Sequence, residues 1–245
     1  MKATPAEQQE LLRLQAVDTR LAQLAHKLGA LPQSAPLAEL AAQDDAVRRS
    51  RAEAFGTLED TKAELARLES DVSLVEARIA RDSERLTHTS SLKDVSALEA
   101  ELASLRKRLS DLEDAELVVM ERVEQATSAV AAIDDERAAI AVAQSKLEGE
   151  RDEAAAGLAT DREHAERDRD VIAEGIPAAL LTFYEQRRTR GGGVGAALLR
   201  QRTCGGCTIT LTGSDLEAVR RAADDEVLQC PECDRILVRT DESGL

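Results

Sequence analysis

The apolar residues between Val95 and Ile172 recur at alternating steps of three and four along the chain. One series begins at Val95 and the other at Leu98, and both keep their phase over this stretch. A seven-residue repeat of this length predicts one long helix with a narrow apolar seam. At about 1.5 Å per residue, the helix would be on the order of 115 Å long. Because such a helix cannot bury its own seam, we expect a partner helix of matching length.

The chain before residue 87 carries the same pattern in two pieces. Residues 4–7 predict a helix start, with a Thr cap, a Pro at the first helical position and a Glu that completes a capping box. Pro32 and Pro36 bracket a predicted break at residues 32–36, because proline inside a helix costs about 3 kcal/mol. The seam after the break is out of phase with the seam before it by two residues, so we expect the break to reset the register.

The polar run Thr-His-Thr-Ser-Ser at residues 87–91 interrupts the repeat and predicts a turn. Arms of nearly equal length flank it, so we expect residues 1–175 to form an intramolecular antiparallel hairpin. In the favoured register Asp44 lies opposite Arg137, and a slip by one heptad stays open as an alternative. A parallel dimer of long helices is the competing interpretation.

The hairpin is predicted to end at residues 174–177, where Gly and Pro cannot continue a helix. We expect residues 176–203 to be a linker, made of a short helix from 178 to 190 and a flexible glycine joint at 191–193. Residues 204–245 would then form a separate small domain.

Composition and charge agree with a coiled coil. The 245 residues have a net charge of −15, and only three of them are aromatic. Residues 176–245 hold nine Lys/Arg and ten Asp/Glu, so nearly all of the acidic excess lies on the hairpin, where it disfavours nucleic acid. No apolar run reaches the roughly 18 residues of a membrane span, and residues 1–7 have no apolar signal core. We expect a soluble cytoplasmic protein that does not bind membranes.

The four cysteines form two Cys-x-x-Cys pairs, Cys204 with Cys207 and Cys230 with Cys233. This is a metal-binding pattern and not a disulfide framework. Four thiolates suit one tetrahedral Zn²⁺ with Zn–S distances of about 2.3 Å, and they leave no open position for a catalytic water. We therefore expect one structural zinc and no catalytic residue. A thiol oxidoreductase and an iron site with the same ligands are the alternatives.

The segment around the cysteines predicts a zinc ribbon that is rich in strands and has one short helix. Residues 208–211, 227–229 and 236–238 predict strands, and residues 214–223 predict a helix capped by Ser214. Because the segment has few apolar residues, zinc would supply much of its folding free energy.

Arginines near the cysteines form a candidate nucleic-acid surface in an otherwise acidic protein. They are Arg187, Arg188, Arg190, Arg200, Arg202, Arg235 and Arg239. Only Phe183 and Tyr184 are available to stack on bases. The alternative interpretation is that these arginines pair with acidic residues at the open end of the hairpin.

Several of these segments resemble a bacterial family of coiled-coil proteins with a C-terminal four-cysteine zinc ribbon. The matching pieces are residues 89–102 at the turn, residues 176–185, the Cys-Gly-Gly-Cys of 204–207 and the Cys-Pro-Glu-Cys-Asp-Arg-Ile-Leu of 230–237. Asp234 departs from the family, which usually has Gly after the last cysteine. The resemblance implies a long helical hairpin with the ribbon at its open end. Because some relatives are flagellar regulators that bind an alternative sigma factor and an mRNA, it also implies a role in transcription.

Together these observations predict a mostly helical, non-enzymatic adaptor that binds a protein partner such as a sigma factor or another transcription component. We expect nucleic-acid contact through the ribbon and its arginines, and a monomer or a weak dimer. One alternative is a structural rod or holdase chaperone in which zinc only staples the fold, and a thiol oxidoreductase is less favoured.

Overall fold

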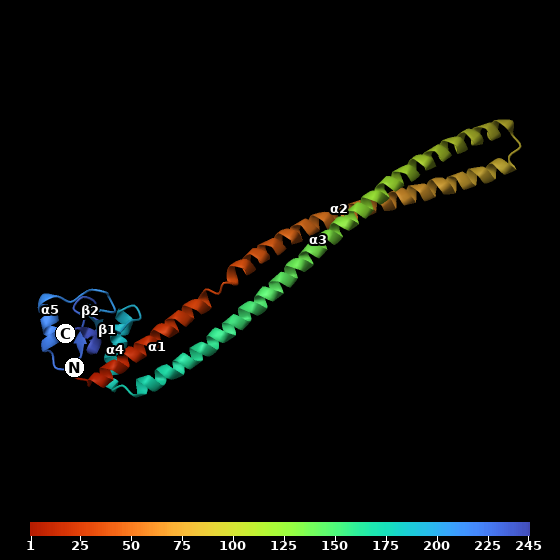
Figure 1. Cartoon of the computed structure of the whole chain (residues 1–245). Helices are drawn as coiled ribbons and strands as arrows, with labels where there is room; N and C mark the ends of the chain where they lie inside the picture. Colours follow the sequence, from red (N-terminus) through yellow and green to blue (C-terminus); the bar gives the residue numbers. More distant parts are fainter. The chain divides into compact units, whose positions relative to one another are not determined.

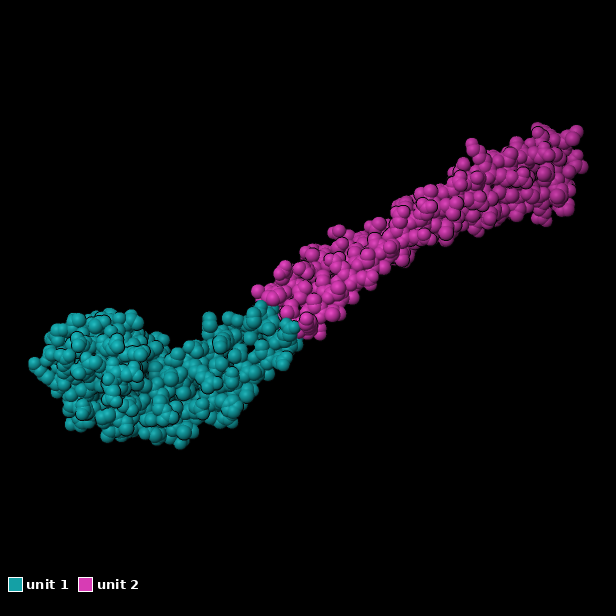
Figure 2. All heavy atoms as spheres, viewed as in Figure 1, with its two compact units in different colours: residues 1–34, 149–245 teal, residues 35–148 magenta.

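The structure is a computed structural model that describes residues 1–245, and helices make up most of it (Figure 1). In chain order the elements are α1 (Pro5–Gly29), α2 (Ser34–His88), α3 (Leu92–Glu174), α4 (Ala178–Arg190), β1 (Ala196–Arg200), β2 (Thr203–Cys204), α5 (Gly213–Arg221), β3 (Leu228–Gln229), β4 (Ile236–Val238) and η1 (Asp241–Ser243). They group into unit 1, with Met1–Ser34 and Gly149–Leu245, and unit 2, with Ala35–Glu148 (Figure 2). No helix has both the length and the apolar character to cross a membrane.

Unit 2 is an antiparallel pair formed by α2 and the first part of α3, as the repeat predicted. Arg137 Nε donates a hydrogen bond to Asp44 Oδ1 at 3.0 Å, which confirms the predicted meeting of these two residues. The two helices therefore pair within one chain, and the competing interpretation, a parallel dimer of long helices, was wrong. The buried apolar residues lie along one seam: Val47, Leu58, Leu98, Leu102, Leu112, Val119 and Ile140.

The turn between these helices lies where the polar run predicted it. Helix α2 ends at His88 and α3 begins at Leu92. The hydroxyl of Ser91 accepts a hydrogen bond from the N–H of Asp94 at 3.4 Å, so it caps the start of α3.

The break between α1 and α2 lies slightly earlier than the predicted residues 32–36. Helix α1 ends at Gly29 and α2 begins at Ser34, whose N–H bonds to the carbonyl of Leu31 at 3.0 Å. Pro36 therefore lies in the first turn of α2. Proline is tolerated there because the first backbone N–H groups of a helix have no intrahelical partner.

Unit 1 has a broader core than the seam of unit 2. Helix α1 begins with the predicted capping box, in which Thr4 N–H bonds to Glu7 Oε2 at 2.7 Å and Glu7 N–H bonds to Thr4 Oγ1 at 3.3 Å. Helices α1 and α4 pack with the last turn of α3 against the strands. Their shared core contains Ala3, Leu11, Leu14, Ile176, Leu180, Tyr184, Ala196, Ile236 and Val238.

The strands of unit 1 form one sheet in the order β2-β1-β4-β3. Strand β1 pairs in parallel with β4, and Ala197 lies opposite Leu237. The outer pairs, β1 with β2 and β3 with β4, are antiparallel. The start of the chain also hydrogen bonds to this unit, since Ala3 N–H donates to the carbonyl of Asp225 at 2.8 Å.

Strand β1 lies inside the segment that we expected to be a linker, residues 176–203. The glycines before it form a tight turn and not a flexible joint. A Cβ on Gly191 would lie 2.3 Å from the carbonyl oxygen of Val194, and Gly193 has a φ of +95°. These positions need glycine for close approach and for left-handed backbone. The ribbon sheet is therefore incomplete without residues of the expected linker.

Two further local predictions were wrong. Residues 208–211 are a loop, held by one isolated bridge between Thr203 and Thr210, because Thr208 adopts a positive φ of 62° that no strand allows. Helix α5 begins one residue before Ser214, and its cap residue Thr212 makes no side-chain capping bond. The predicted strands at 227–229 and 236–238 correspond to β3 and β4.

Candidate metal centre

Two backbone turns of the same geometry present the cysteines. In the first, Thr208 N–H donates to the Cys204 carbonyl at 2.8 Å, and in the second, Asp234 N–H donates to the Cys230 carbonyl at 2.9 Å. Thr208 and Asp234 have φ values of +62° and +64°. The residue after each pair therefore adopts the left-handed conformation that favours Gly. This explains how Asp234 stands where the resembled family usually has Gly, because Asp tolerates this region better than most residues.

The four sulfur atoms converge. Cys204 Sγ lies 3.9 Å from Cys233 Sγ, and Cys207 Sγ lies 3.8 Å from Cys230 Sγ. All four lie within 4.8 Å of one another. A tetrahedral zinc with Zn–S bonds of about 2.3 Å requires sulfur atoms about 3.8 Å apart, so the arrangement fits. Four thiolates close the coordination shell, and the centre is a site for one structural zinc, as predicted.

The two cysteines that begin the pairs are the most deeply enclosed. Cys204 and Cys230 have no exposed surface, and apolar residues of the ribbon surround them. Burial raises the pKa of Cys204 and raises that of Cys230 to about 12. A metal must therefore displace protons from these thiols when it binds, which makes zinc affinity fall as pH falls.

Cys233 differs from its partner in the second pair. Burial, the largest single influence, pushes its pKa upward. Hydrogen bonds from the backbone and side chain of Arg235 and from the thiols of Cys230 and Cys207 outweigh burial and lower the pKa of Cys233 to about 7. Within the second pair, the sulfur of Cys233 therefore forms a thiolate more readily than that of Cys230.

Close packing explains the small residues within the first pair. A Cβ on Gly206 would lie 2.6 Å from Arg235 Cδ and 3.1 Å from Ala197 Cβ. The first knuckle therefore lies directly against β1 and against Arg235, which comes two residues after the second knuckle. Strand β1 is part of the support of the metal site, although it precedes the first cysteine in the sequence.

Two family models together match most of the chain. The CT398-like coiled coil hairpin domain matches residues 14–192, and the C4-type zinc ribbon domain matches residues 203–237. The chain belongs to the CT398-like coiled-coil hairpin family. The resemblance noted from the sequence is thus confirmed for the hairpin and the ribbon, while the flagellar and sigma-factor grouping stays a prediction.

Similar proteins cover nearly the whole of this CT398-like chain. An uncharacterized protein of Mycobacterium tuberculosis H37Rv is 36% identical over 244 residues, which is 98% of each chain. A solved structure from Mycobacterium smegmatis has a TM-score of 0.86 and 34% identity, over 98% of this chain and 100% of that one. CT398 from Chlamydia trachomatis has a TM-score of 0.64 and 20% identity, over 96% and 98%, so it supports the fold alone.

Four of the seven candidate arginines bond to other parts of unit 1. Arg235 donates to the carbonyls of Val194 and Gly191, and Arg239 donates to carbonyls at the end of α5. Arg187 bonds to Asp234 at 3.2 Å and lies 4.9 Å from the ring centroid of Phe183. Arg188 bonds to Glu185 within α4 and lies 3.6 Å from Asp18 Oδ2 of α1. These four stabilise the unit by holding its segments together.

The other three arginines of the candidate set face solvent. Arg200 lies 3.2 Å from Glu242 with 71% of its side chain exposed, and Arg202 donates to the carbonyl of Gly244 at 3.2 Å. Arg190 is exposed at the end of α4, beside the hollow that Arg187 and Cys233 also line. The structure therefore leaves a smaller arginine surface than the sequence suggested.

A buried polar cluster at the base of the hairpin was not predicted. Tyr184 is fully buried, so it is not available to stack on a base, and its hydroxyl donates to Asp18 Oδ2 at 2.7 Å. Burial, together with this hydrogen bond, raises the pKa of Tyr184. Asp18 Oδ1 accepts from Arg169 Nε at 2.6 Å, and Arg169 also pairs with Glu185.

Gln15 completes the base cluster, which comprises Gln15, Asp18, Arg169, Tyr184 and Glu185. Its Oε1 accepts from the N–H of Gly195 at 2.7 Å, and its Nε2 donates to the carbonyl of Gly193 at 3.1 Å. One side chain thus fixes the glycine turn to α1. The sequence gives only a weak indication of this cluster, namely that Gln15 and Asp18 are polar residues on the otherwise apolar face of α1.

Proposed function

We propose that the protein is a non-enzymatic adaptor that binds a protein of the transcription machinery, such as a sigma factor. Its four-sulfur zinc centre supports the fold and leaves no coordination position for a reacting water. The hairpin would supply the main binding surface. The sigma factor is the first candidate because the family resemblance implies it.

The observation that carries this proposal is the burial pattern of unit 2. Helix α2 is 55 residues long, yet only Val47, Leu58, Thr61 and Asp82 are buried in it. Most of its residues are exposed to solvent along the pair with α3. A paired helix of this length with so little buried surface suits contact with another large molecule.

A narrower second proposal is that nucleic acid contacts the ribbon through Arg190, Arg200 and Arg202. Their exposure favours it, since the side chains of the other four candidate arginines are only partly exposed. Contact of this kind would be electrostatic and sensitive to salt, and it would carry little sequence preference.

The test uses the full-length, zinc-loaded chain. Deleting the ribbon is unsuitable, because the ribbon shares a core with α1 and α4. The immobilised protein would be exposed to purified RNA polymerase core and sigma factors, and to cell extract with and without nuclease. Selective binding of one transcription protein that survives nuclease supports the adaptor. Absence of any selective partner contradicts it and favours the structural rod.

The arginine proposal has its own variant and control. Arg190→Glu, Arg200→Glu and Arg202→Glu together are expected to abolish binding to labelled single-stranded RNA and DNA. Arg49→Glu, Arg67→Glu and Lys93→Glu on unit 2 change the net charge equally and are expected to preserve it. Equal loss in both variants would show a non-specific charge effect and overturn the proposal.

A further inference from the structure

Helix α3 in unit 2 carries a short run of exposed apolar residues. Leu117, Val118 and Met120 are 61%, 58% and 43% exposed. The other large apolar residues exposed on this unit are isolated from one another along the chain: Phe55, Leu74, Leu92 and Val142. Single exposed apolar residues are ordinary, whereas neighbouring ones favour contact with another molecule.

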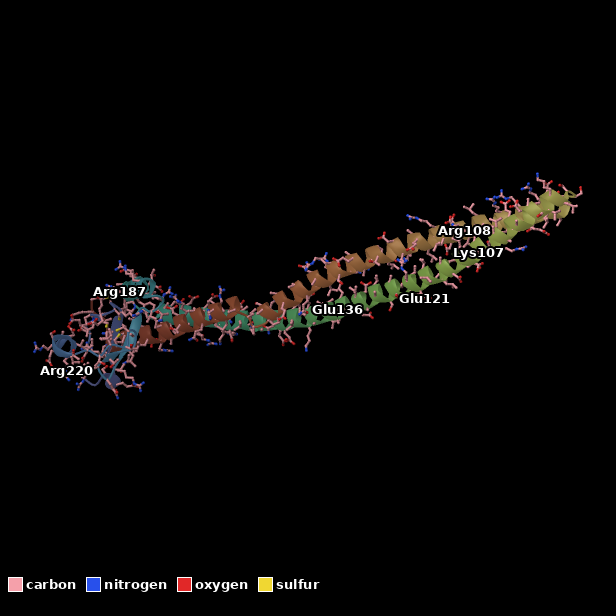
Figure 3. The ribbon with its side chains drawn as sticks, turned by 90° about the horizontal axis from the view of Figure 1, so that it is seen from above. Lys107, Arg108, Glu121, Glu136, Arg187 and Arg220 are labelled. Atoms are coloured by element: carbon pink, nitrogen blue, oxygen red, sulfur yellow. The ribbon has the colours of Figure 1, made fainter.

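Two blocks of opposite charge lie on α3 just before this run. The basic block contains Arg106, Lys107 and Arg108, and Figure 3 labels the last two on the helix. The acidic block contains Asp111, Glu113 and Asp114. All six side chains are exposed, and none forms an ion pair, although elsewhere in this unit Arg122 and Arg137 pair with acids of α2. The six charges sum to zero.

Lys107, Asp111, Asp114, Leu117 and Val118 share one face of the helix, and the other three charged residues lie on its flanks. Residues 103, 107, 110, 114 and 117 follow steps of four and three, as do 104, 107, 111, 114 and 118. Such spacing places them in adjacent rows on one side of an α-helix. The basic block lies toward the N-terminal end of this face, and the acidic block and the apolar residues lie toward its C-terminal end.

We propose that this face, residues 103–118, binds the same face of a second copy of the chain in antiparallel orientation. Lys107 then lies opposite Asp114 of the second copy. Arg106 meets Glu113 on one flank, and Arg108 meets Asp111 on the other. Each pairing occurs twice, because a two-fold axis makes the contact self-complementary.

The apolar residues find small partners in the same arrangement. Leu117 meets Ala103 of the second copy, and Val118 meets Ser104. Both small residues are exposed on the outer face, so the helices can approach closely there. A parallel arrangement would instead place base against base and acid against acid. The order of charges along the helix therefore selects the antiparallel dimer.

The association is weak and depends on salt. Exposed ion pairs contribute little each and are screened at moderate ionic strength. The rest of the chain, outside residues 103–118, carries most of the net charge of −15, which opposes close approach of two copies. Burial of the apolar side chains offsets this repulsion.

The first experiment is sedimentation equilibrium of the full-length, zinc-loaded protein over a range of protein and salt concentrations. The mass is expected to rise from 26.4 kDa toward twice that value with concentration, and to fall back with salt. Replacing Leu117 and Val118 with Ser should weaken association by about tenfold or more, while Val142→Ser should not. A mass that stays monomeric at every concentration would overturn the proposal.

Charge reversal tests the pairing itself. One variant carries Arg106→Glu, Lys107→Glu and Arg108→Glu, and another carries Asp111→Lys, Glu113→Lys and Asp114→Lys. Each alone should be monomeric, and an equimolar mixture should form a heterodimer. The second variant has a smaller net negative charge. If non-specific repulsion alone controlled association, this variant would self-associate more strongly than the wild type, whereas the proposed pairing predicts that it is monomeric.

A control variant carries Asp135→Lys, Glu136→Lys and Glu148→Lys, which change the net charge by the same amount but lie on α3 outside the proposed face (Figure 3 labels Glu136). This control should still form a dimer. Circular dichroism would confirm that all variants remain helical. Dimers that persist in both reversal variants, or a mixture that stays monomeric, would show that these residues do not form the contact.

Discussion

The two units of this protein reach stability in different ways. Unit 2 repeats one simple contact along its length, a seam of apolar residues between two helices with ion pairs beside it. Unit 1 gathers short segments from both ends of the chain around two small cores, a buried polar cluster and a metal centre. In unit 2 each residue makes one of many similar contacts, whereas in unit 1 single side chains such as Asp18 and Gln15 bond to several segments at once.

The difference predicts where the protein tolerates change. In a repeated seam each contact stabilises its neighbourhood and a loss stays local. In unit 1, strand β1 pairs with β4, which follows the last cysteine, and β1 also packs against the first knuckle. The loss of one contact of β1 therefore affects several segments. Substitutions of equal chemistry should therefore have larger effects in unit 1.

Removing a zinc ligand should give the largest effect. Cys230→Ser is expected to unfold the ribbon, because a structural zinc supplies about 10–16 kcal/mol of binding free energy. The helical signal of unit 2 should persist. Zinc content by atomic absorption, and hydrogen exchange measured separately over residues 35–148 and 196–238, would check this. Protection of the ribbon strands in the metal-free variant would contradict the prediction.

The base cluster should be the next most sensitive feature. Asp18→Ala leaves Arg169 and the buried hydroxyl of Tyr184 without their shared partner, and breaking a buried pair costs about 3–5 kcal/mol. Denaturant unfolding monitored in unit 1 measures the loss in unfolding free energy. Asp161→Ala is the matched control: its pair with Arg20 spans 3.8 Å at the surface and should be worth less than about 1 kcal/mol.

Shortening one leucine in each unit compares their cores directly. Leu14 has no exposed surface in the core of unit 1, and Leu58 is 5% exposed in the seam of unit 2. Leu→Ala costs about 2–5 kcal/mol in general, and we expect Leu14→Ala near the top of this range and Leu58→Ala near its bottom. A two-helix seam can close around a missing side chain more easily than a multi-segment core. Equal losses by chemical denaturation would contradict this contrast.

The Asp44–Arg137 ion pair should give the smallest effect. Asp44→Asn with Arg137→Gln is expected to change the unfolding free energy by less than about 1 kcal/mol, because both side chains keep solvent contact. A double-mutant cycle isolates the pair, and Asp45→Asn provides a nearby exposed control. A coupling energy several times larger would show that the pair has a dominant part in setting the register.

The sequence predicted what depends on repeats and local chemistry. The heptads predicted the hairpin, the favoured register of its two seams predicted the Asp44–Arg137 contact, and cysteine spacing predicted the zinc ligands. Each of these signals lies within a short window or follows a fixed period, so no knowledge of distant packing is needed.

The features that the sequence did not predict depend on contacts between distant segments. Strand β1 is Ala-Ala-Leu-Leu-Arg beside a glycine run, and its pairing with β4 and β2 makes it a strand. Likewise, the turn at residues 191–195 is held by distant and backbone partners that the sequence does not reveal. The N–H groups of Gly191 and Gly193 bond to carbonyls of α4, and that of Gly195 bonds to Gln15. Tyr184 was counted as available to stack on a base, because nothing in its local sequence shows that its hydroxyl bonds to Asp18.

The parallel pairing of β1 with β4 also sets an order of assembly during synthesis. The residues of unit 2 leave the ribosome well before β4, so their two helices can associate while the rest of the chain is still being made. The centre of the ribbon sheet must wait for residues 236–238, and the zinc ligands are in place only just before then. Metal capture is therefore a late event in biogenesis, and a nascent chain that stalls before residue 230 presents the hairpin without its metal-stabilised end.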